Sequence, residues 1–233
     1  MKKIAVLQSN YIPWKGYFDI IASVDEFIIY DDVQYTKNDW RNRNRIKTSS
    51  GLQWLTIPVF YQFAYERTQK IRDTRIKSIG WQMSHWEALV NSYKLAPHFN
   101  EIAVWLRPLY ENMLDENLSH VNLQFIKAIC CYIGIKTKLS YSWDYLYKEG
   151  RTERLISLCK QTGADEYISG PKAKNYIEES MFDNAGISLR WFDYSNYPVY
   201  PQMWGKFTHE VSILDLLFNC GKDASNYMKY KLE

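Results

Sequence analysis

The chain has 233 residues, of which 46% are apolar and 24% are charged, and its formal net charge is +3. This balance is typical of a globular protein and excludes disordered, collagenous and fibrous classes. Aromatic residues make up 16% of the chain, with 19 Tyr and 9 Trp. Because Tyr and Trp combine an apolar body with a polar tip, this surplus favours a partly hydrated binding cleft.

Membrane spans, export signals and metal or disulfide frameworks are not expected. The longest apolar stretch has about eight residues, well below the roughly 18 that a membrane span needs. Gln8 interrupts the N-terminal apolar run too early for a signal peptide. The 4 cysteines show no C-x-x-C or Cys/His ligand spacing. We therefore expect a cytoplasmic protein with buried thiols and no metal centre.

The N-terminal part, residues 1–60, predicts a β-α-β arrangement. Short runs of β-type apolar residues predict strands over Lys3–Ser9 and Glu26–Asp31. Between them, Gly16–Asp25 has apolar residues at near-helical spacing. A third strand is expected over Gln53–Val59, after a polar loop.

The middle part, residues 76–135, predicts a helical insertion. Apolar residues recur at spacings of three and four over Ile79–Leu95, Asn100–Leu114 and Leu118–Ile133. Gly134 follows the last of these segments, where a left-handed residue that ends a helix is expected.

The C-terminal part, residues 138–233, returns to alternating strands and helices. Such alternation predicts a Rossmann-like α/β fold, with a mainly parallel sheet flanked by helices. No repeat, low-complexity tract or linker divides the chain, so we expect a single domain over 1–233. The expected strands are Lys138–Trp143, Glu166–Ser169 and Ser188–Tyr194, and the expected helices are Thr152–Thr162, Lys172–Ala185 and His209–Asn219.

The loop after the first strand is a candidate ligand-binding loop, because sites in such sheets lie at the carboxyl ends of the strands. Gly16 admits a close backbone approach, and the N-terminus of the following helix can face a phosphate. Alternatively, Trp14 and Tyr17 only close one end of the sheet. No G-x-G-x-x-G or Walker A motif supports a dinucleotide or P-loop site. The candidate binding residues are Gln8, Asn10, Tyr11, Trp14, Gly16 and Tyr17.

Adjacent carboxylates follow the second strand. Asp31 and Asp32 are expected to point in opposite directions, so only one of them faces the cleft easily. An acid or base role for Asp32, or a divalent ion held by one carboxylate and a substrate phosphate, is chemically possible. Capping of the following turn is the alternative. Gln34 and Tyr35, from the same segment, are further candidate binding residues.

The segment Lys37–Lys47 is basic but also contains three asparagines and a tryptophan. Since Arg is well suited to bidentate phosphate contacts, the segment indicates an anionic ligand such as a nucleotide diphosphate or a phosphorylated donor. A solvated charged face is the alternative, and nucleic acid is less favoured. The candidate residues are Trp40, Asn42, Arg43, Asn44, Arg45 and Lys47.

His85 is the best candidate for a general base among the 4 histidines, because the ordinary pKa of histidine lies near neutrality. It lies early in a predicted helix, between Trp81 and Trp86. This catalytic role requires that the helical insertion cover the cleft. A structural histidine with satisfied hydrogen bonds is the default alternative.

Two later segments offer further candidates. Ser169 and Gly170 lead from a strand into a helix, where backbone amides can hold an anion, but no G-x-S-x-G motif supports Ser169 as a nucleophile. Tyr200 and Gln202 follow the last strand and can contribute to a binding site. A rigid turn bounded by prolines is the alternative there.

These segments resemble the WbqC-like protein family, which is encoded in bacterial O-antigen and other surface-polysaccharide gene clusters. The resemblance covers nearly the whole chain, with one departure at Ser9, where the family commonly has proline. It implies a cytoplasmic enzyme that acylates or aminoacylates a nucleotide-linked amino sugar. The matching stretches are Gln8–Tyr17, Tyr30–Tyr35, Asn42–Lys47, Trp54–Val59, Tyr167–Gly170, Tyr200–Gln202 and Ser212–Asn219.

The leading hypothesis is therefore a transferase that uses an activated acyl donor. Arg43, Arg45 and Lys47 are expected to bind the diphosphate, and Asp32 or His85 to deprotonate the attacking amine. A noncatalytic glycan-binding or assembly protein is the alternative, as is a transferase that contacts an aminoacyl-tRNA donor. The rings expected to stack on base or sugar are those of Trp14, Tyr17 and Trp40, and the amides expected to bind hydroxyls are those of Asn10, Gln34, Asn42 and Asn44.

Overall fold

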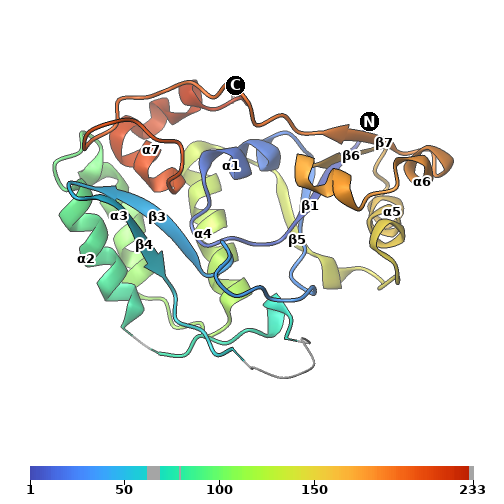
Figure 1. Ribbon diagram of the computed structural model, residues 1–233, viewed down its shortest axis with the longest axis horizontal. Coiled ribbons are helices and arrows are strands. Elements are labelled where there is room, and N and C mark those ends of the chain that lie inside the picture. Colours follow the sequence, from blue (N-terminus) through green and yellow to red (C-terminus); the bar gives the residue numbers. More distant parts are fainter. Residues whose placement is uncertain (62–68, 79, 231–233) are drawn as a thin grey trace.

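The computed structural model describes residues 1–61, 69–78 and 80–230. A five-stranded parallel sheet forms its centre, in the order β5-β2-β1-β6-β7. This sheet, with helices on both faces, confirms the expected Rossmann-like α/β fold (Figure 1). The strands are β1 (Lys3–Leu7), β2 (Glu26–Ile29), β5 (Lys138–Tyr141), β6 (Glu166–Ser169) and β7 (Ser188–Trp191).

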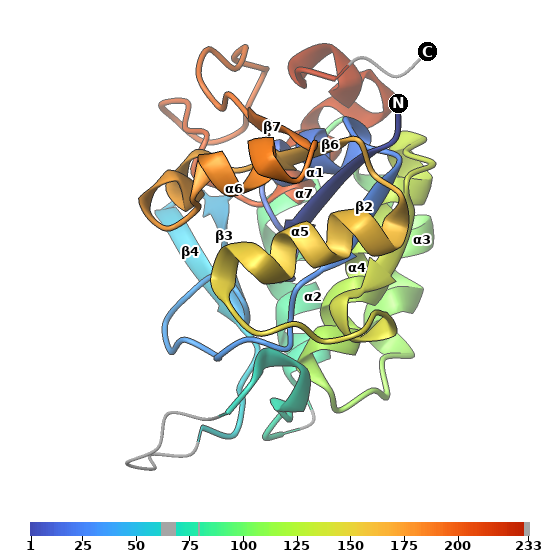
Figure 2. The same cartoon turned by 90° about the vertical axis from the view of Figure 1, so that its right-hand side faces the viewer.

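Each face of the sheet contributes to its own apolar core. Side chains alternate across β1, so that Ile4 and Val6 face one core and Ala5 faces the other. Figure 2 shows α5 in front of the sheet, with α2 and α4 behind it. The smaller core contains α5 (Arg151–Thr162) and α6 (Glu179–Asn184), and the larger core contains α1 (Lys15–Ala22), α2 (Trp81–Tyr93), α3 (Phe99–Glu111), α4 (Leu118–Ile133) and α7 (Ile213–Cys220).

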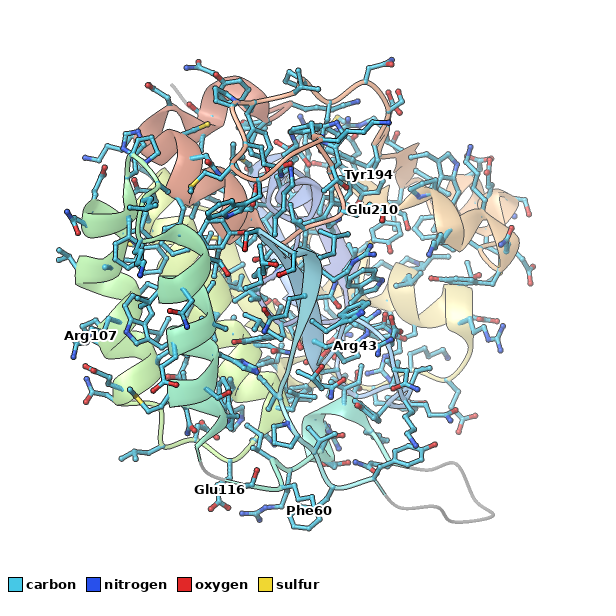
Figure 3. All side chains as sticks on the ribbon, turned by 60° about the vertical axis from the view of Figure 1, so that its left-hand side comes forward. Arg43, Phe60, Arg107, Glu116, Tyr194 and Glu210 are labelled. Atoms are coloured by element: carbon cyan, nitrogen blue, oxygen red, sulfur yellow. The ribbon has the colours of Figure 1, made fainter. Side chains whose placement is uncertain are left out.

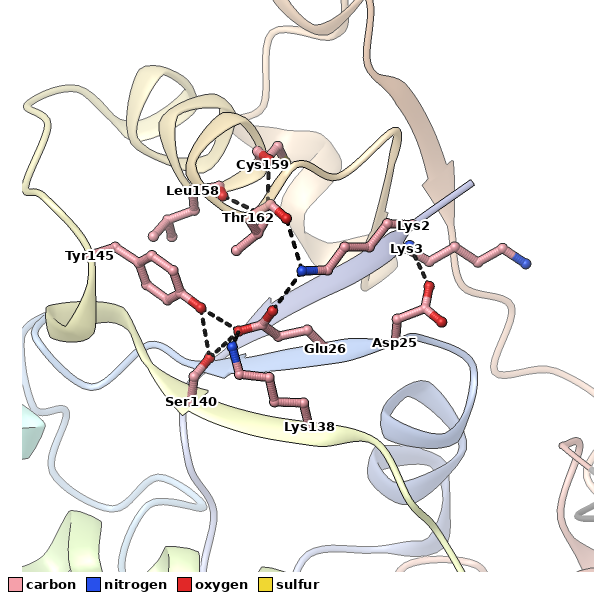
Figure 4. A network of polar contacts seen from close by, with 10 residues as sticks. All are labelled: Lys2, Lys3, Asp25, Glu26, Lys138, Ser140, Tyr145, Leu158, Cys159 and Thr162. Carbon is pink, nitrogen blue, oxygen red and sulfur yellow. Dashed lines mark hydrogen bonds and ion pairs between the residues drawn. The ribbon is translucent and has the colours of Figure 1, made fainter.

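A buried carboxylate joins the strands at the amino end of the sheet (Figure 4). Glu26 is 1% exposed and pairs with Lys2 Nζ at 2.9 Å and Lys138 Nζ at 3.0 Å. Its carboxylate also accepts hydrogen bonds from the hydroxyl groups of Ser140 and Tyr145. Burial raises the pKa of Glu26, but these partners outweigh burial and lower the pKa to about 2.

The helices between β2 and β5 agree with the sequence patterns. α4 has the expected bounds, and Gly134 ends it in the left-handed conformation with φ of 82°. Ile79, the first residue of the expected helix Ile79–Leu95, lies outside the described residues. Among the helices of the described ranges, none is long and apolar enough to cross a membrane.

The segment predicted as a polar loop is instead largely a strand. β3 (Arg43–Thr48) pairs antiparallel with β4 (Gly51–Thr56) in a separate two-stranded sheet. The strand expected over Gln53–Val59 corresponds to β4, which begins and ends a few residues earlier. It does not join the parallel sheet. Along β3, buried Asn44 and Ile46 alternate with partly exposed arginines. A polar residue at an inward position obscures the two-residue period on which strand prediction rests.

The helix expected over Lys172–Ala185 is divided in two. A 3-10 turn over Pro171–Asn175 precedes α6, which begins only at Glu179. Between them, the backbone N–H of Glu178 donates to Thr152 Oγ1 of α5 at 3.2 Å, so it does not bond within a helix. The contact between Glu178 and Thr152 thus lies at a break in the segment Lys172–Ala185, whose sequence pattern alone is compatible with one continuous helix.

The last helix begins later than predicted. The hydroxyl of Ser212 accepts a hydrogen bond from the Leu214 N–H at 3.2 Å and caps α7. His209 therefore lies in the non-helical connection between β7 and α7. Figure 1 shows this connection running across the top of the molecule to α7 on the opposite side.

The order of the strands reverses at β1. This central strand pairs with β2 on one side and with β6 on the other. Connections that leave the carboxyl ends of neighbouring strands in opposite directions open a crevice there. The edge between β1 and β6 is therefore where the fold itself favours a ligand site.

Candidate functional site

A pocket of about 540 Å³ lies at the carboxyl ends of β1 and β6. Its volume falls within the range of small-molecule sites. Four parts of the chain form its walls: the end of β1 with the following loop, the start of the hairpin, the turn after β6, and the connection to α7. The lining residues are Val6, Leu7, Gln8, Asn10, Pro13, Trp14, Tyr17, Trp40, Arg41, Asn44, Arg45, Ser169, Gly170, Pro171, Lys172, Ala173, Tyr176, Tyr194, His209, Glu210 and Val211.

Some of the candidate residues named from the sequence lie together in this pocket. Those that line the pocket come from the first loop, from the basic segment and from the end of β6, as the topology requires. They are Gln8, Asn10, Trp14, Tyr17, Trp40, Asn44, Arg45, Ser169 and Gly170.

Two arginines of the basic segment face the pocket. Arg41, which the sequence did not single out, donates from Nη1 to Asn10 Oδ1 at 2.5 Å and to the Ser9 carbonyl at 3.2 Å. Arg45 pairs with Glu210 at 2.9 Å, and its guanidinium lies 5.5 Å from the ring of Trp40. Both cations are therefore oriented by contacts at the pocket wall.

Two aromatic rings, those of Trp14 and Tyr194, form part of the pocket wall. Trp14 packs against Tyr194 and Tyr197, each with a ring separation of 5.4 Å. Gly16 does not line the pocket, but a Cβ at this position would lie 2.4 Å from the Trp14 ring. The absence of a side chain at Gly16 thus allows Trp14 to lie over α1.

Tyr17 and Asn44 hold the first loop in place through its backbone carbonyls. The Tyr17 hydroxyl donates to the Gln8 carbonyl at 3.0 Å. Asn44 Nδ2 donates to the carbonyls of Tyr11 and Ile12 at 3.1 and 2.9 Å. Ile12 has a positive φ of 37°, which a non-glycine residue adopts only when its surroundings impose it.

The adjacent aspartates point in opposite directions, and neither lines the pocket. Asp31 is fully buried and accepts hydrogen bonds from the hydroxyls of Ser9 and Ser119 at 2.6 and 2.5 Å. Asp32 pairs with Arg154 of α5. Within the described ranges, no group of three or more His, Cys, Asp or Glu side chains could hold a metal ion.

His85 is buried against Tyr11 and Trp81 of the larger core and does not line the pocket. It is 6% exposed, its Nδ1 lies 2.9 Å from the Tyr11 hydroxyl, and its ring is 5.3 Å from that of Trp81. Burial lowers its pKa to about 4. The imidazole is thus a neutral part of the core.

Lys47, Tyr200 and Gln202 belong to a buried network beside the pocket. Lys47 Nζ donates to Gln202 Oε1 at 2.8 Å. Asp215 of α7 accepts hydrogen bonds from Tyr200, Gln202 and Tyr93 at 2.6, 2.6 and 2.7 Å. These contacts tie the hairpin to α2, α7 and the preceding connection.

The remaining candidates also make contacts outside the pocket. Gln34 forms a single antiparallel bridge with Lys70, and Tyr35 is buried against Tyr61 with a ring separation of 5.9 Å. Asn42 Nδ2 donates to the Ile57 carbonyl at 2.8 Å, and Arg43 stacks on Trp54. The basic segment is therefore not a free cationic arm.

Comparison with protein-family models confirms the resemblance found in the sequence motifs. The family model described as "WbqC-like protein family" matches residues 8–227. This chain belongs to the WbqC-like protein family. "Uncharacterized protein Rv1507c" of Mycobacterium tuberculosis (strain H37Rv) is 56% identical over 230 residues, which cover 99% of each chain. No solved structure matches the chain significantly.

The match to the WbqC-like family includes every pocket residue except Val6 and Leu7. It therefore also spans the connection to α7. Tyr200 and Gln202 of this connection were named from the sequence, but the residues of it that line the pocket are Tyr194, His209, Glu210 and Val211. Figure 3 shows Tyr194 and Glu210 of this connection above Arg43 of the hairpin. Ser212, followed by Asp215, is a possible helix start and is the local signal that could have placed His209 and Glu210 outside the helix.

Proposed function

We propose that this chain is a cytoplasmic transferase of bacterial surface-polysaccharide biosynthesis. In this proposal it transfers an acyl or aminoacyl group to the amine of a nucleotide-linked amino sugar. The observation that carries the proposal is the combination of cationic, aromatic and amide side chains in one pocket at the carboxyl edge of a parallel sheet. The pathway follows from the gene clusters in which the WbqC-like family occurs.

The diphosphate of the substrate is assigned to Arg41, Arg45 and Lys172. All three line the pocket, whereas Arg43 and Lys47 are engaged elsewhere. The current partner of Arg45 is a carboxylate with a side-chain exposure of 67%. Since exposed ion pairs contribute little, a phosphate can replace this partner at low cost.

The base and sugar are assigned to the aromatic and amide groups. Trp14 and Trp40 offer faces on which a nucleobase or a pyranose ring can stack. Gln8 and Asn10 each carry both a donor and an acceptor, which suits sugar hydroxyls. No resident cofactor enters this assignment; the co-substrate is an activated acyl donor.

The group assigned to the attacking amine is Glu210. Neither Asp32 nor His85 lines the pocket, and each already has a buried partner. Glu210 is the carboxylate in the pocket wall, and a carboxylate can both attract an ammonium and accept its proton. Binding of the diphosphate by Arg45 would release Glu210 for this role.

The proposal is tested by a thermal shift panel of UDP- and dTDP-linked amino sugars. At least one member is expected to raise the melting temperature of the chain, and Arg45→Ala is expected to remove that shift. Arg107→Ala is the matched control, because Arg107 pairs with Glu111 on the outer face of α3 (Figure 3). The absence of a shift with every sugar nucleotide would rule the proposal out.

A further inference from the structure

His209 forms part of the pocket wall contributed by the connection to α7. Its ring makes an edge contact with Phe207, with centroids 4.6 Å apart and planes at 84°. The His209 ring also lies beside the ring of Tyr197, with centroids 6.4 Å apart. Such contacts hold the imidazole in one orientation relative to the pocket.

The two ring nitrogens of His209 are in different surroundings. Nδ1 is buried and has no hydrogen-bond partner among residues 1–61, 69–78 and 80–230. Because Nδ1 is buried, Nε2 is the nitrogen that a ligand in the pocket can reach. Whether His209 donates a hydrogen bond to a ligand or accepts one therefore depends on which ring nitrogen carries the proton.

The charges near His209 disfavour its protonated form. Lys15 of α1 lines the same small crevice as His209 and donates to the carbonyls of Pro198 and Tyr227 at 3.0 and 2.9 Å. The adjacent Glu210 pairs with Arg45, so its charge is compensated. Burial, followed by the charge of Lys15, lowers the pKa of His209.

A neutral imidazole has a single proton to place. On Nδ1 it would be a buried donor without an acceptor. On Nε2 the proton can be donated to a ligand in the pocket, and no buried donor is left without an acceptor. The second tautomer is therefore favoured.

We infer that His209 is a neutral hydrogen-bond donor that presents Nε2–H to the carbonyl oxygen of the transferred acyl group. The inference rests on the proposed acyl transfer. Arg41, Arg45 and Lys172 already provide cations for phosphate, whereas a neutral donor suits an oxygen that is uncharged before the reaction and gains charge during it.

In this step the amine nitrogen of the sugar forms a bond to the acyl carbon. The carbonyl electron pair moves to oxygen, which accepts the hydrogen bond from His209. When the carbonyl re-forms, the bond to the leaving group of the thioester or activated ester donor breaks. The amine proton passes to Glu210 and from there to the leaving group, so the enzyme is regenerated.

The tautomer can be measured on the free protein by NMR of the histidine ring nitrogens. Loss of one signal set in His209→Gln assigns His209. We expect an Nε2–H imidazole at pH 7 and a pKa below the ordinary 6.5. A proton on Nδ1, or a pKa at or above 6.5, would overturn the inference.

Ligand binding gives the second test, with UDP-N-acetylglucosamine, which carries an acyl carbonyl, and UDP-glucosamine, which does not. His209→Ala is expected to raise the Kd of the acetylated ligand about tenfold and to leave that of UDP-glucosamine unchanged. His209→Gln, which keeps an N–H donor, should restore part of the loss. The exposed His120 provides the control variant His120→Ala, for which no change is expected.

The outcomes separate the inference from the proposed function. If His209→Ala weakens the binding of both ligands equally, the His209 N–H contacts a group that the two share, such as a phosphate. The carbonyl contact would then be overturned, while the proposed transferase action on a sugar nucleotide would stand. If no sugar nucleotide binds the unmodified chain, both the proposed function and the carbonyl contact fail. The measured tautomer would still decide whether His209 is a neutral donor.

Discussion

The ammonium of Lys47 donates to Oε1 of Gln202 at 2.8 Å, across 155 positions of the sequence. Lys47 is 4% exposed and makes a second hydrogen bond to the carbonyl of Lys206 at 2.7 Å. The contact fixes the connection before α7 against the hairpin. The two walls that carry Arg45 and Glu210 are therefore positioned relative to each other by a side-chain network beside the pocket.

Replacement of Lys47 by Met is expected to destabilise the fold. The change removes the hydrogen bonds of the buried ammonium to Gln202 and to the Lys206 carbonyl, and the loss of hydrogen bonds made by a charged group costs about 1 to 3 kcal/mol. Urea unfolding measures the effect. Lys127→Met, at an exposed position of α4, is the matched control and should change the free energy of unfolding by less than about 0.5 kcal/mol. Equal effects of the two variants would contradict the role given to Lys47.

Glu26 is expected to make the fold sensitive to acid. Its pKa is lowered from 4.5 to about 2 in the folded chain, so the native state binds this proton less readily than the unfolded state. The stabilisation is present above pH 4.5 and is lost as the pH falls toward 2. Glu26→Gln should lower the free energy of unfolding at pH 7 and flatten its pH dependence in that window. Glu87→Gln, at an exposed position, should preserve the acid dependence.

His85 is expected to influence stability without contributing to binding. Burial lowers its pKa from 6.5 to about 4. The unfolded chain therefore takes up the proton first, and stability decreases as the pH falls from 6.5 toward 4. His85→Gln should weaken this dependence and leave the Kd of a bound sugar nucleotide unchanged. A large loss of affinity without unfolding would restore His85 as a site residue.

Gly16→Ala is expected to displace Trp14 from the pocket wall. Alanine normally favours a helix by about 1 kcal/mol over glycine, but here its Cβ would lie 2.4 Å from the Trp14 ring. We expect overpacking to cost about 1 to 3 kcal/mol of stability and sugar-nucleotide affinity to fall. Gly170→Ala is a useful stability control, because its nearest neighbour is the Tyr194 hydroxyl at 3.7 Å. Unchanged Trp fluorescence and affinity in Gly16→Ala would refute the packing argument.

Local sequence patterns correctly predicted the strands whose side chains are buried among apolar residues and the helix that ends at a local termination signal. β1 and β2 are short apolar strands with buried side chains on both faces, and α4 ends at Gly134 as the local signal requires. β3 was missed because Asn44 faces inward and is satisfied by carbonyls of a distant loop. The alternation of apolar and polar residues does not reveal that a buried polar side chain is hydrogen-bonded to a segment far away in the sequence.

For the site, the sequence by itself determined the membership in the WbqC-like family, the parallel sheet and the loops most suited to a ligand. The alternation of strands and helices is a local property of the chain, and it dictates which strand ends can meet. Only the tertiary structure decided which side chains of these loops reach the pocket. It turned Asp32 toward Arg154, placed His85 in the core and brought His209 to the pocket wall. The physical reason is that the partner of a polar side chain is chosen by packing between segments far apart in sequence, and local spacing carries no record of that choice.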